Sequence, residues 1–180
     1  MEFLEGIKGR RSVRKFKDEQ VGHDVLGRVV EAAACAPSWK NAQIARYIVI
    51  EDTALKNEIA DNCVMDFAFN AATIKNAPAL VIVTYVAGRS GFERDGSFST
   101  SKEDRWEMFD AGIASQTFCL AAHNEGLGSV IMGIFDDEKV AAAAGVPEGQ
   151  KVAALIPIGY PDESPQMPKR KTADELLSFK

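Results

Sequence analysis

The sequence predicts a single α+β domain, residues 1–180, in which helices flank a mixed β-sheet. One hundred and eighty residues are within the range of one domain, and contents of 46% hydrophobic and 26% charged residues are ordinary for a globular protein. Helical and strand patterns are interspersed, and the longest helical pattern is rich in small residues suited to close packing. No Gly-x-Gly-x-x-Gly motif follows a predicted strand, so a Rossmann unit is not expected.

The first half of the chain contains three predicted helices and two predicted strands. Apolar residues at helical spacing predict the helices, and Pro37 ends the second of them. A β-branched and aromatic run predicts the first strand, and an apolar run before Thr84 predicts a central strand buried on both faces. The expected helices cover residues 3–9, 24–35 and 53–62, the last capped by Thr53, and the expected strands cover residues 46–50 and 77–83.

The second half begins with a polar segment. Residues 88–102 are rich in glycine, serine and charged residues, which indicates a loop that acts as a mobile lid or a disordered excursion. Further along, Asp136 is expected to cap a helix that ends at Gly145. The remaining expected helices cover residues 103–124 and 172–179, the expected strands cover residues 129–132 and 152–158, and residues 161–168 form an extended proline-rich tail.

Composition and charge exclude several classes of function. A formal net charge of −5 argues against a general nucleic-acid binder. Three widely spaced cysteines and two histidines predict neither a disulfide framework nor a metal site, and Cys35 and Cys119 lie among apolar residues where a buried thiol is expected. Reduced thiols, an acidic start without signal-peptide blocks and no bilayer-spanning apolar run predict a cytoplasmic protein.

The most informative local feature is a basic segment after the first helix. Arg10, Arg11 and Arg14 surround Ser12 in an otherwise acidic chain. Alternate residues of an extended segment point the same way, so Arg10, Ser12 and Arg14 can converge on one anion. Guanidinium groups present paired donors that fit phosphate oxygens, although a solvated basic face is the alternative interpretation.

A second unusual segment follows the second helix. Residues 36–43 combine a proline, a tryptophan, a serine and two amides directly after an apolar helical pattern. Together the two segments predict a site for a phosphorylated planar cofactor.

Both segments resemble the nitroreductase family of FMN-dependent oxidoreductases. The similarity extends in order from about Ile7 to Leu176 and includes the segments Phe69-Asn70, Gly126-Leu127-Gly128-Ser129, Met132-Gly133-Ile134-Phe135 and Ile158-Gly159-Tyr160-Pro161. The resemblance implies a three-layer fold with a mixed central sheet between helices, assembled as an intertwined homodimer. The chain departs from many relatives at Ile44-Ala45, where they have Pro-Trp, which bears on the substrate pocket more than on flavin binding.

The resemblance also assigns roles to individual residues of a site for tightly, non-covalently bound FMN. The phosphate and ribityl chain would be held by Arg10, Arg11, Ser12 and Arg14, with Lys169 or Arg170 reaching the phosphate from the tail. The partner subunit would supply Pro37, Ser38, Trp39 and Asn41 across the dimer interface. Asn70 would bind the ring edge or the ribityl chain, and Met132, Gly133 and Ile134 would lie along the ring, with a backbone N–H near flavin N5.

Each of these residues also has an ordinary structural interpretation. Trp39 is equally a core aromatic, and Asn70 a helix or turn cap. Met132 and Ile134 fit simple alternation in a strand, and residues 169–171 fit a solvated charge run. The joint placement of the residues favours the cofactor interpretation.

The resemblance implies an enzyme whose chemistry is carried by the flavin, with no catalytic side chain and no metal. NADH or NADPH would deliver hydride, leave, and be replaced by a nitroaromatic, quinone or related flat acceptor in ping-pong order. Two alternatives stay open. One is a non-catalytic flavin-binding sensor or carrier, and the other is a specialised family member, such as a reductive dehalogenase or a flavin-fragmenting enzyme.

Overall fold

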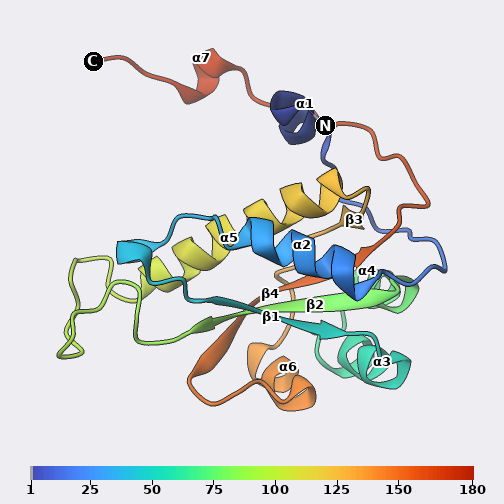
Figure 1. The fold of residues 1–180 in the computed structure, drawn as a ribbon, viewed down its shortest axis with the longest axis horizontal. Helices are drawn as coiled ribbons and strands as arrows, with labels where there is room; N and C mark the ends of the chain where they lie inside the picture. Colours follow the sequence, from blue (N-terminus) through green and yellow to red (C-terminus); the bar gives the residue numbers. More distant parts are fainter. Residues whose placement is uncertain (1) are drawn as a thin grey trace.

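The computed structural model describes residues 2–180, and Figure 1 shows helices packed on both sides of one β-sheet. The helices are α1 (Phe3–Gly9), α2 (His23–Ala33), a 3₁₀ turn (Trp39–Asn41), α3 (Thr53–Asn62), α4 (Ala68–Asn76), α5 (Arg105–Asn124), α6 (Asp137–Ala144) and α7 (Ala173–Leu176). The strands are β1 (Ala45–Ile50), β2 (Ala79–Val86), β3 (Gly128–Ser129) and β4 (Gln150–Gly159).

The sheet has the strand order β1-β2-β4-β3, and these four strands pair antiparallel. In the central register Ile82 lies between Ile48 of β1 and Leu155 of β4. Within residues 2–180 the parallel pairing is an isolated bridge between Ser12 and Ser129, so the expected mixed character of the sheet is confined to that bridge.

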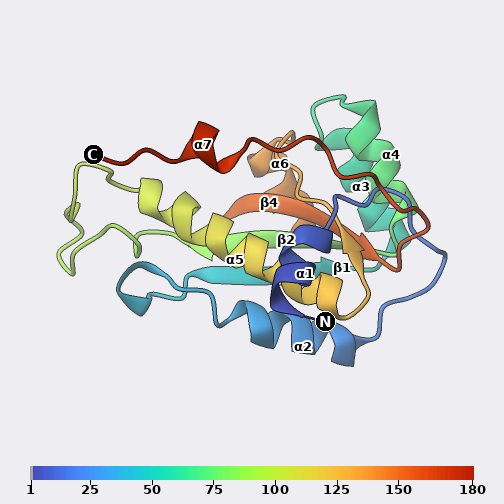
Figure 2. The same cartoon turned by 90° about the horizontal axis from the view of Figure 1, so that it is seen from above.

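Helices α2 and α5 cover one face of the sheet, and helices α3, α4 and α6 cover the other (Figures 1 and 2). Strand β2 is buried on both faces, as its apolar run predicts, because its alternate residues point into different cores. Val81 and Val83 pack under α2 and α5, whereas Leu80 and Ile82 pack against the opposite layer. The α+β class is therefore confirmed.

Several local expectations differ from the structure. Asp52, and not Thr53, caps α3, because its carboxylate accepts the Leu55 N–H at 2.8 Å. Helix α4 was not expected, since its N-cap Phe67 offers no side-chain acceptor. The expected strand at 129–132 is reduced to β3 and a bridge between Met132 and Leu155. Cys35 is exposed and not buried, because it follows the last turn of α2.

Other expectations are confirmed. The carboxylate of Asp136 accepts the Lys139 N–H at 3.0 Å, and Gly145 ends α6 with a φ of 62° that favours glycine. Helix α5 begins two residues later than expected and ends at Asn124. Within residues 2–180 no helix combines the length and apolar character that crossing a membrane requires.

After β4 the chain is hydrogen-bonded to residues 14–17 through Tyr160, Asp162 and Glu163. Beyond these residues the C-terminal segment leaves the body of the molecule and ends apart from it (Figure 1). Several of its apolar side chains are exposed, including Met167, Leu176 and Phe179. Helix α1 likewise has no buried residue and exposes Phe3 and Leu4, so both ends of the chain carry uncovered apolar surface.

Phe118 tests the α2/α5 core. Its ring is 1% exposed and stacks on Tyr47 with a centroid distance of 5.1 Å. Phe118→Ala is expected to lower the free energy of unfolding by about 3–5 kcal/mol, measured by urea denaturation, because it leaves a cavity. Phe118→Leu keeps most of the buried volume and should cost less than half as much. Equal losses for both variants would show that packing volume is not what Phe118 contributes.

Candidate functional site

The basic segment lies directly against β3. The Val13 N–H donates to the Ser129 carbonyl at 3.1 Å, and the Val13 side chain is buried. Glycine is required at position 128, because a Cβ there would lie 2.7 Å from a Val13 methyl group. With Val13 directed inward, the flanking residues Ser12 and Arg14 are half-exposed, as the alternation of an extended segment predicts.

The three guanidinium groups of the segment have different surroundings. Arg11 donates to the carbonyls of Lys8 and Arg10 at 2.6 and 2.9 Å and so closes the end of α1. Arg14 lies over the Phe69 ring, 5.4 Å from its centroid. In the part of the chain that the structure describes, no carboxylate forms an ion pair with Arg10, Arg11 or Arg14. The segment therefore retains positive charge for an anion.

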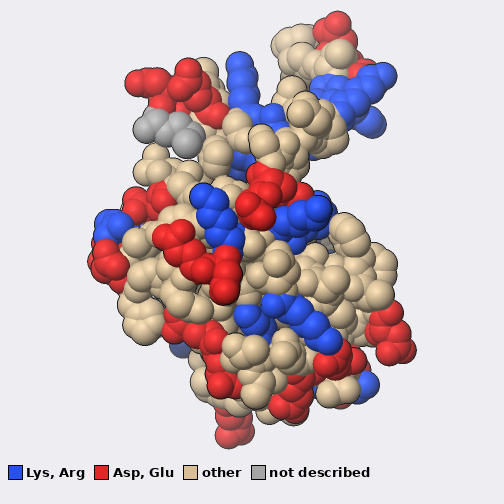
Figure 3. Space-filling model, turned by 90° about the vertical axis from the view of Figure 1, so that its right-hand side faces the viewer, with Lys and Arg blue, Asp and Glu red and all other residues tan. Residues whose placement is uncertain are grey.

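Two adjoining cavities open beside this segment. The larger measures about 540 Å³ and lies between the segment and α4; its lining includes Ser12, Arg14, Phe69, Thr73 and Asn76. The second, about 430 Å³, is lined by Arg10, Arg11 and His123 among others. Figure 3 faces the end of the molecule on which the chain turns from this segment toward α2, and basic and acidic side chains are interspersed there. A local anion site fits this surface better than a broad basic one.

Glu163 holds the basic segment in place by binding its backbone. Its Oε1 accepts the N–H groups of Arg14 and Lys15 at 2.6 and 3.2 Å, and the carboxylate borders both cavities. Nearby, burial and the positive charges of Arg10 and Arg11 lower the pKa of His123, which favours the neutral imidazole. The site therefore gains no positive charge from His123 at neutral pH.

Asn70 connects α4 to the segment after β3. Its side chain is buried, and its Nδ2 donates to the Ile134 carbonyl at 3.2 Å. The Met132 side chain is buried in the core, so only its backbone is available to the site. Gly133 is exposed, and a Cβ built on it meets no atom within 4 Å. The structure thus brings Ser12, Arg14, Asn70 and the 132–134 backbone to one end of the molecule.

The 37–41 segment lies elsewhere, against the first turns of α5. The Trp39 N–H donates to Asp110 Oδ2 at 2.9 Å, and the Trp39 ring lies 4.7 Å from that of Trp106. The Trp39 indole N–H is buried and has no hydrogen-bond acceptor among residues 2–180. A buried donor without an acceptor is rare in a complete structure, so this atom points to a missing partner.

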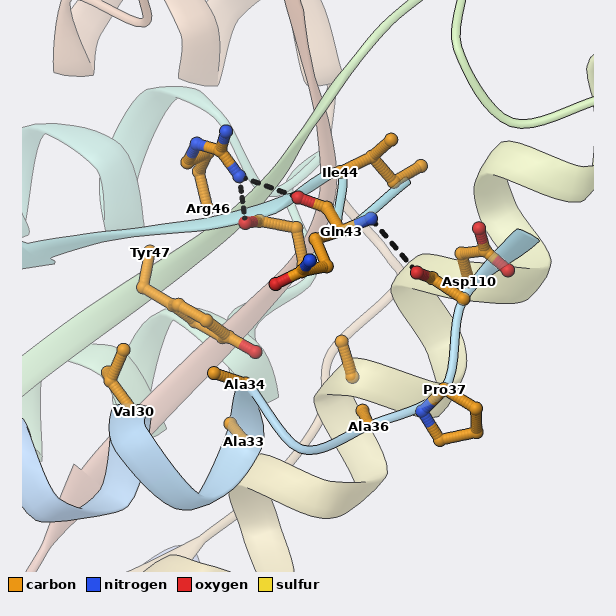
Figure 4. A pocket seen from close by; sticks show the side chains of 13 residues that line it. Val30, Ala33, Ala34, Ala36, Pro37, Gln43, Ile44, Arg46, Tyr47 and Asp110 are labelled. Carbon is orange, nitrogen blue, oxygen red and sulfur yellow. Dashed lines mark hydrogen bonds between the residues drawn. The ribbon is translucent and has the colours of Figure 1, made fainter. Parts of the chain in front are cut away.

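A small cavity of about 160 Å³ lies behind this segment, and Figure 4 shows Tyr47 and Asp110 at its wall. Burial, with a smaller effect of Cys119, raises the pKa of Tyr47 to about 12, so the phenol stays protonated. Ala45 and Ile44 also line this cavity, at the position where the sequence departs from many relatives.

The two predicted halves of the site are far apart in one chain. Helix α5 has 20 residues and is therefore about 30 Å long. Asp110 holds Trp39 near its start, whereas Ser129 holds the basic segment just beyond its end. Figure 2 shows the 37–43 loop and the chain that follows residue 10 at opposite ends of the molecule. One chain alone cannot bring both segments to one cofactor.

Lys169 and Arg170 are exposed on the C-terminal segment, and within residues 2–180 neither forms a hydrogen bond or ion pair with the basic segment. The sequence analysis missed the buried carboxylates Glu107 and Asp110 and the half-buried Glu163, all of which bind loop backbone. Glu107 and Asp110 are three residues apart and therefore lie on one side of the helix, but nothing in this spacing marks them as buried, because their partners lie on distant loops.

A cavity beside guanidinium groups that have no ion-pair partner among residues 2–180 is suited to a phosphate-bearing cofactor. The model of the nitroreductase family matches residues 7–160. A candidate NADH dehydrogenase/NAD(P)H nitroreductase of Methanothermobacter thermautotrophicus is 33% identical over 169 residues, which are 92% of this chain and 80% of that protein. The chain belongs to the nitroreductase family.

Solved structures agree with this assignment. A nitroreductase family protein from Clostridium novyi NT superposes with a TM-score of 0.77 at 32% identity, covering 93% of this chain and 89% of that one. Oxidised iodotyrosine deiodinase, bound to FMN and 3-iodo-L-tyrosine, superposes with a TM-score of 0.81 at 23% identity and covers 99% of this chain and 100% of that one. The second likeness is one of fold.

Gly128 tests the contact that holds the basic segment. Gly128→Ala is expected to lower the free energy of unfolding by about 1–3 kcal/mol, because the added methyl group overlaps Val13 and pushes the segment away from Ser129. Thermal and urea unfolding measure the effect. Gly27→Ala is the control, since a Cβ there meets no atom within 4 Å on α2. A Gly128→Ala protein as stable as the control would show that Val13 yields without cost.

Proposed function

We propose that the protein is an FMN-dependent oxidoreductase that takes hydride from NADH or NADPH and reduces flat acceptors such as nitroaromatics or quinones. The observation that carries the proposal is the cavity beside Ser12 and Arg14, whose cationic groups have no carboxylate partner among the described residues. A phosphate group would give these guanidinium groups a charged partner.

The residues present fit FMN in charge and in shape. Arg10, Ser12 and Arg14 would bind the phosphate and the ribityl chain, and Lys169 or Arg170 would add a further cation. Asn70, already fixed by its bond to the Ile134 carbonyl, would present its remaining polar groups to the ribityl chain or to the ring edge. The exposed, side-chain-free surface of Gly133 permits close approach of a flat ring.

FMN, when bound, supplies the hydride chemistry that no side chain of this protein performs. The protein would bind the flavin and orient it. The backbone at Gly133 and Ile134 would direct an N–H toward the reacting edge of the ring, and the guanidinium groups would provide positive potential beside it. Because donor and acceptor would use the same exposed face in turn, ping-pong kinetics are expected.

The proposed active form is a homodimer, because each site needs the 37–41 segment of the other subunit. The exposed face of α5 supports this assembly. Met108, Phe109 and Ile113 lie along a shallow apolar groove on α5, and Met108 and Phe109 are 50% and 56% exposed. Exposed apolar patches of this kind mark association surfaces. The extended C-terminal segment, with its exposed Phe179, is suited to pack against a second copy of the chain.

Two other functions would give different results. A flavin carrier or sensor would bind FMN without rapid reduction by NADH or NADPH. A reductive dehalogenase, which the fold likeness to iodotyrosine deiodinase brings into consideration, would release halide from a halogenated phenol while reducing nitroaromatics slowly.

The proposed function is tested by the visible spectrum of the purified protein, followed by anaerobic addition of NADH and then NADPH. Flavin bands that bleach with either nucleotide and return when a quinone is added are expected. Bands that persist after both nucleotides are added would indicate a flavin carrier or sensor and not an enzyme. A colourless protein that fails to bind added FMN would overturn the proposal.

Arg14→Ala is expected to weaken FMN binding by at least about 10-fold, since one hydrogen-bonded charge pair with the phosphate is lost. Titration of the apoprotein, followed by the quenching of flavin fluorescence, measures the dissociation constant. Arg28→Ala removes an arginine already paired with Asp24 and Glu125 and should leave it unchanged. An unchanged constant in Arg14→Ala would remove Arg14 from the phosphate site.

Met108→Glu tests the proposed interface. A carboxylate in the first turn of α5 is compatible with the helix, because it interacts favourably with the helix dipole, but it places a charge on the exposed apolar face. We expect a monomer in sedimentation velocity and loss of bound FMN. Gln116→Glu, at the end of the same groove, is expected to weaken the dimer less. A Met108→Glu dimer that keeps its flavin would place the interface elsewhere.

A further inference from the structure

One oxygen of Asp110 holds two separate loops. Asp110 Oδ2 accepts the Trp39 backbone N–H at 2.9 Å and the Ser90 hydroxyl at 2.5 Å. The first donor belongs to the segment that follows α2, and the second to the loop that follows β2. A single carboxylate therefore ties the 37–41 segment to the 88–102 loop and both to α5.

The environment of Asp110 shows that these bonds are its principal support. The side chain is 3% exposed, and within residues 2–180 no Lys, Arg or His forms an ion pair with it. A buried carboxylate without a cation depends on hydrogen-bond donors to offset the cost of its burial. The bonds to Trp39 and Ser90 are charge-assisted and directional, so they fix the backbone position of Trp39 firmly.

The segment needs this support because its own backbone is strained. Lys40, Asn41 and Gln43 have φ values of 44°, 56° and 48°, a region that residues other than glycine avoid. Local bonds help, since Ser38 Oγ accepts the Gln43 N–H at 2.9 Å and Lys40 forms an exposed ion pair with Glu93. Asp110 supplies the anchor that is buried. Figure 4 shows it on α5, beside the part of the segment that carries Pro37.

We propose that Asp110 is a positioning residue for the flavin site of the partner subunit: by fixing the Trp39 backbone it presents residues 37–41 to FMN bound by the other chain. The inference rests on the proposed function, and it assigns a role to a side chain that lies at the far end of α5 from the basic segment of its own chain. Loss of Asp110 therefore damages the site across the interface and spares the site that its own basic segment forms.

The chain offers a matched control one turn away. Glu107 is 2% exposed on the same helix and also binds a loop backbone, since its Oε1 accepts the N–H groups of Gly88 and Arg89 at 2.5 and 3.3 Å. Among residues 2–180, no hydrogen bond joins Glu107 to the 37–41 segment. Glu107→Gln thus removes a buried charge of the same kind without touching Trp39.

The first experiment measures the dissociation constant of FMN for apoprotein prepared from the wild type, Asp110→Asn and Glu107→Gln, with visible circular dichroism of the bound flavin. We expect Asp110→Asn to weaken binding by about 10-fold or more and to change the flavin dichroism, because a neutral amide with a single acceptor oxygen replaces the carboxylate that holds the segment. Glu107→Gln should stay within about threefold of the wild type even where its melting temperature falls as much. Equal effects of both variants on FMN affinity would reduce Asp110 to a structural role and overturn the proposal.

The second experiment uses hybrid dimers, each made of one Arg14→Ala subunit and one Asp110→Asn subunit that carry different affinity tags. If Asp110 acts on the partner's site, one site combines the intact basic segment with the intact Asp110, and the hybrid binds one FMN per dimer with wild-type affinity. If Asp110 acts within its own subunit, each site carries one defect and no wild-type site is found. The second result overturns the proposal even where the Asp110→Asn homodimer is unstable.

Different results would contradict the proposed function and the role of Asp110. A wild-type protein that binds no FMN contradicts the proposed function, and the inference about Asp110 falls with it. A wild-type dimer that binds FMN, with no wild-type site in the hybrid, leaves the proposed function intact and contradicts the role of Asp110 alone.

Discussion

The length of α5 is the constraint on which the rest of the structure depends. One side of the helix is buried against the sheet and α2 through small and apolar residues, among them Ala111, Phe118 and Ala122. This burial fixes the position of the α5 axis. The helix therefore sets the distance between the segment held near Asp110 and the segment held beside Ser129. The opposite side keeps an apolar surface exposed. In the proposed homodimer, a long helix with one part of the proposed FMN site held near each end and an exposed apolar side suits a two-fold assembly, in which each part of the site meets the complementary part of the second copy.

Acidic side chains organise the loops at both ends, and they do so through backbone N–H groups and not through arginines. Glu163 binds the backbone of Arg14 and Lys15, and Asp110 binds that of Trp39. This choice of partner has two consequences. The loops gain fixed positions without regular secondary structure, since their donors are satisfied. Among residues 2–180, the guanidinium groups of the basic segment keep no ion-pair partner although the chain as a whole is acidic, so this segment presents positive charge to an anion.

The sequence predicts the parts of this structure that depend on local pattern. The apolar run of β2, the stripe of α2 and the Asp136 cap of α6 were all recoverable, because periodicity and capping are properties of neighbouring residues. Helix α4 was not, since neither an N-cap nor a clear apolar stripe marks it. The family resemblance identifies the candidate site residues but does not give their geometry. The sequence does not show that Arg11 closes α1. It also does not show that the Met132 side chain is buried, because that burial depends on packing between segments distant in sequence. Asp110 belongs to the same class, because its partners are far away along the chain.

Cofactor binding and subunit association become one equilibrium if each site is shared. The basic segment of one chain, without the partner's 37–41 segment, is an open cationic surface that would hold FMN weakly and leave the buried Trp39 indole N–H of the other chain without its partner. The factor by which association raises the affinity for FMN must equal the factor by which FMN strengthens association, because the two bindings are thermodynamically linked. The apparent affinity for FMN would then rise with protein concentration until the dimer is complete. In that linkage the proposed α5 interface would contribute to flavin binding together with Arg14, although none of the described residues that line its groove also lines the cavity beside the basic segment.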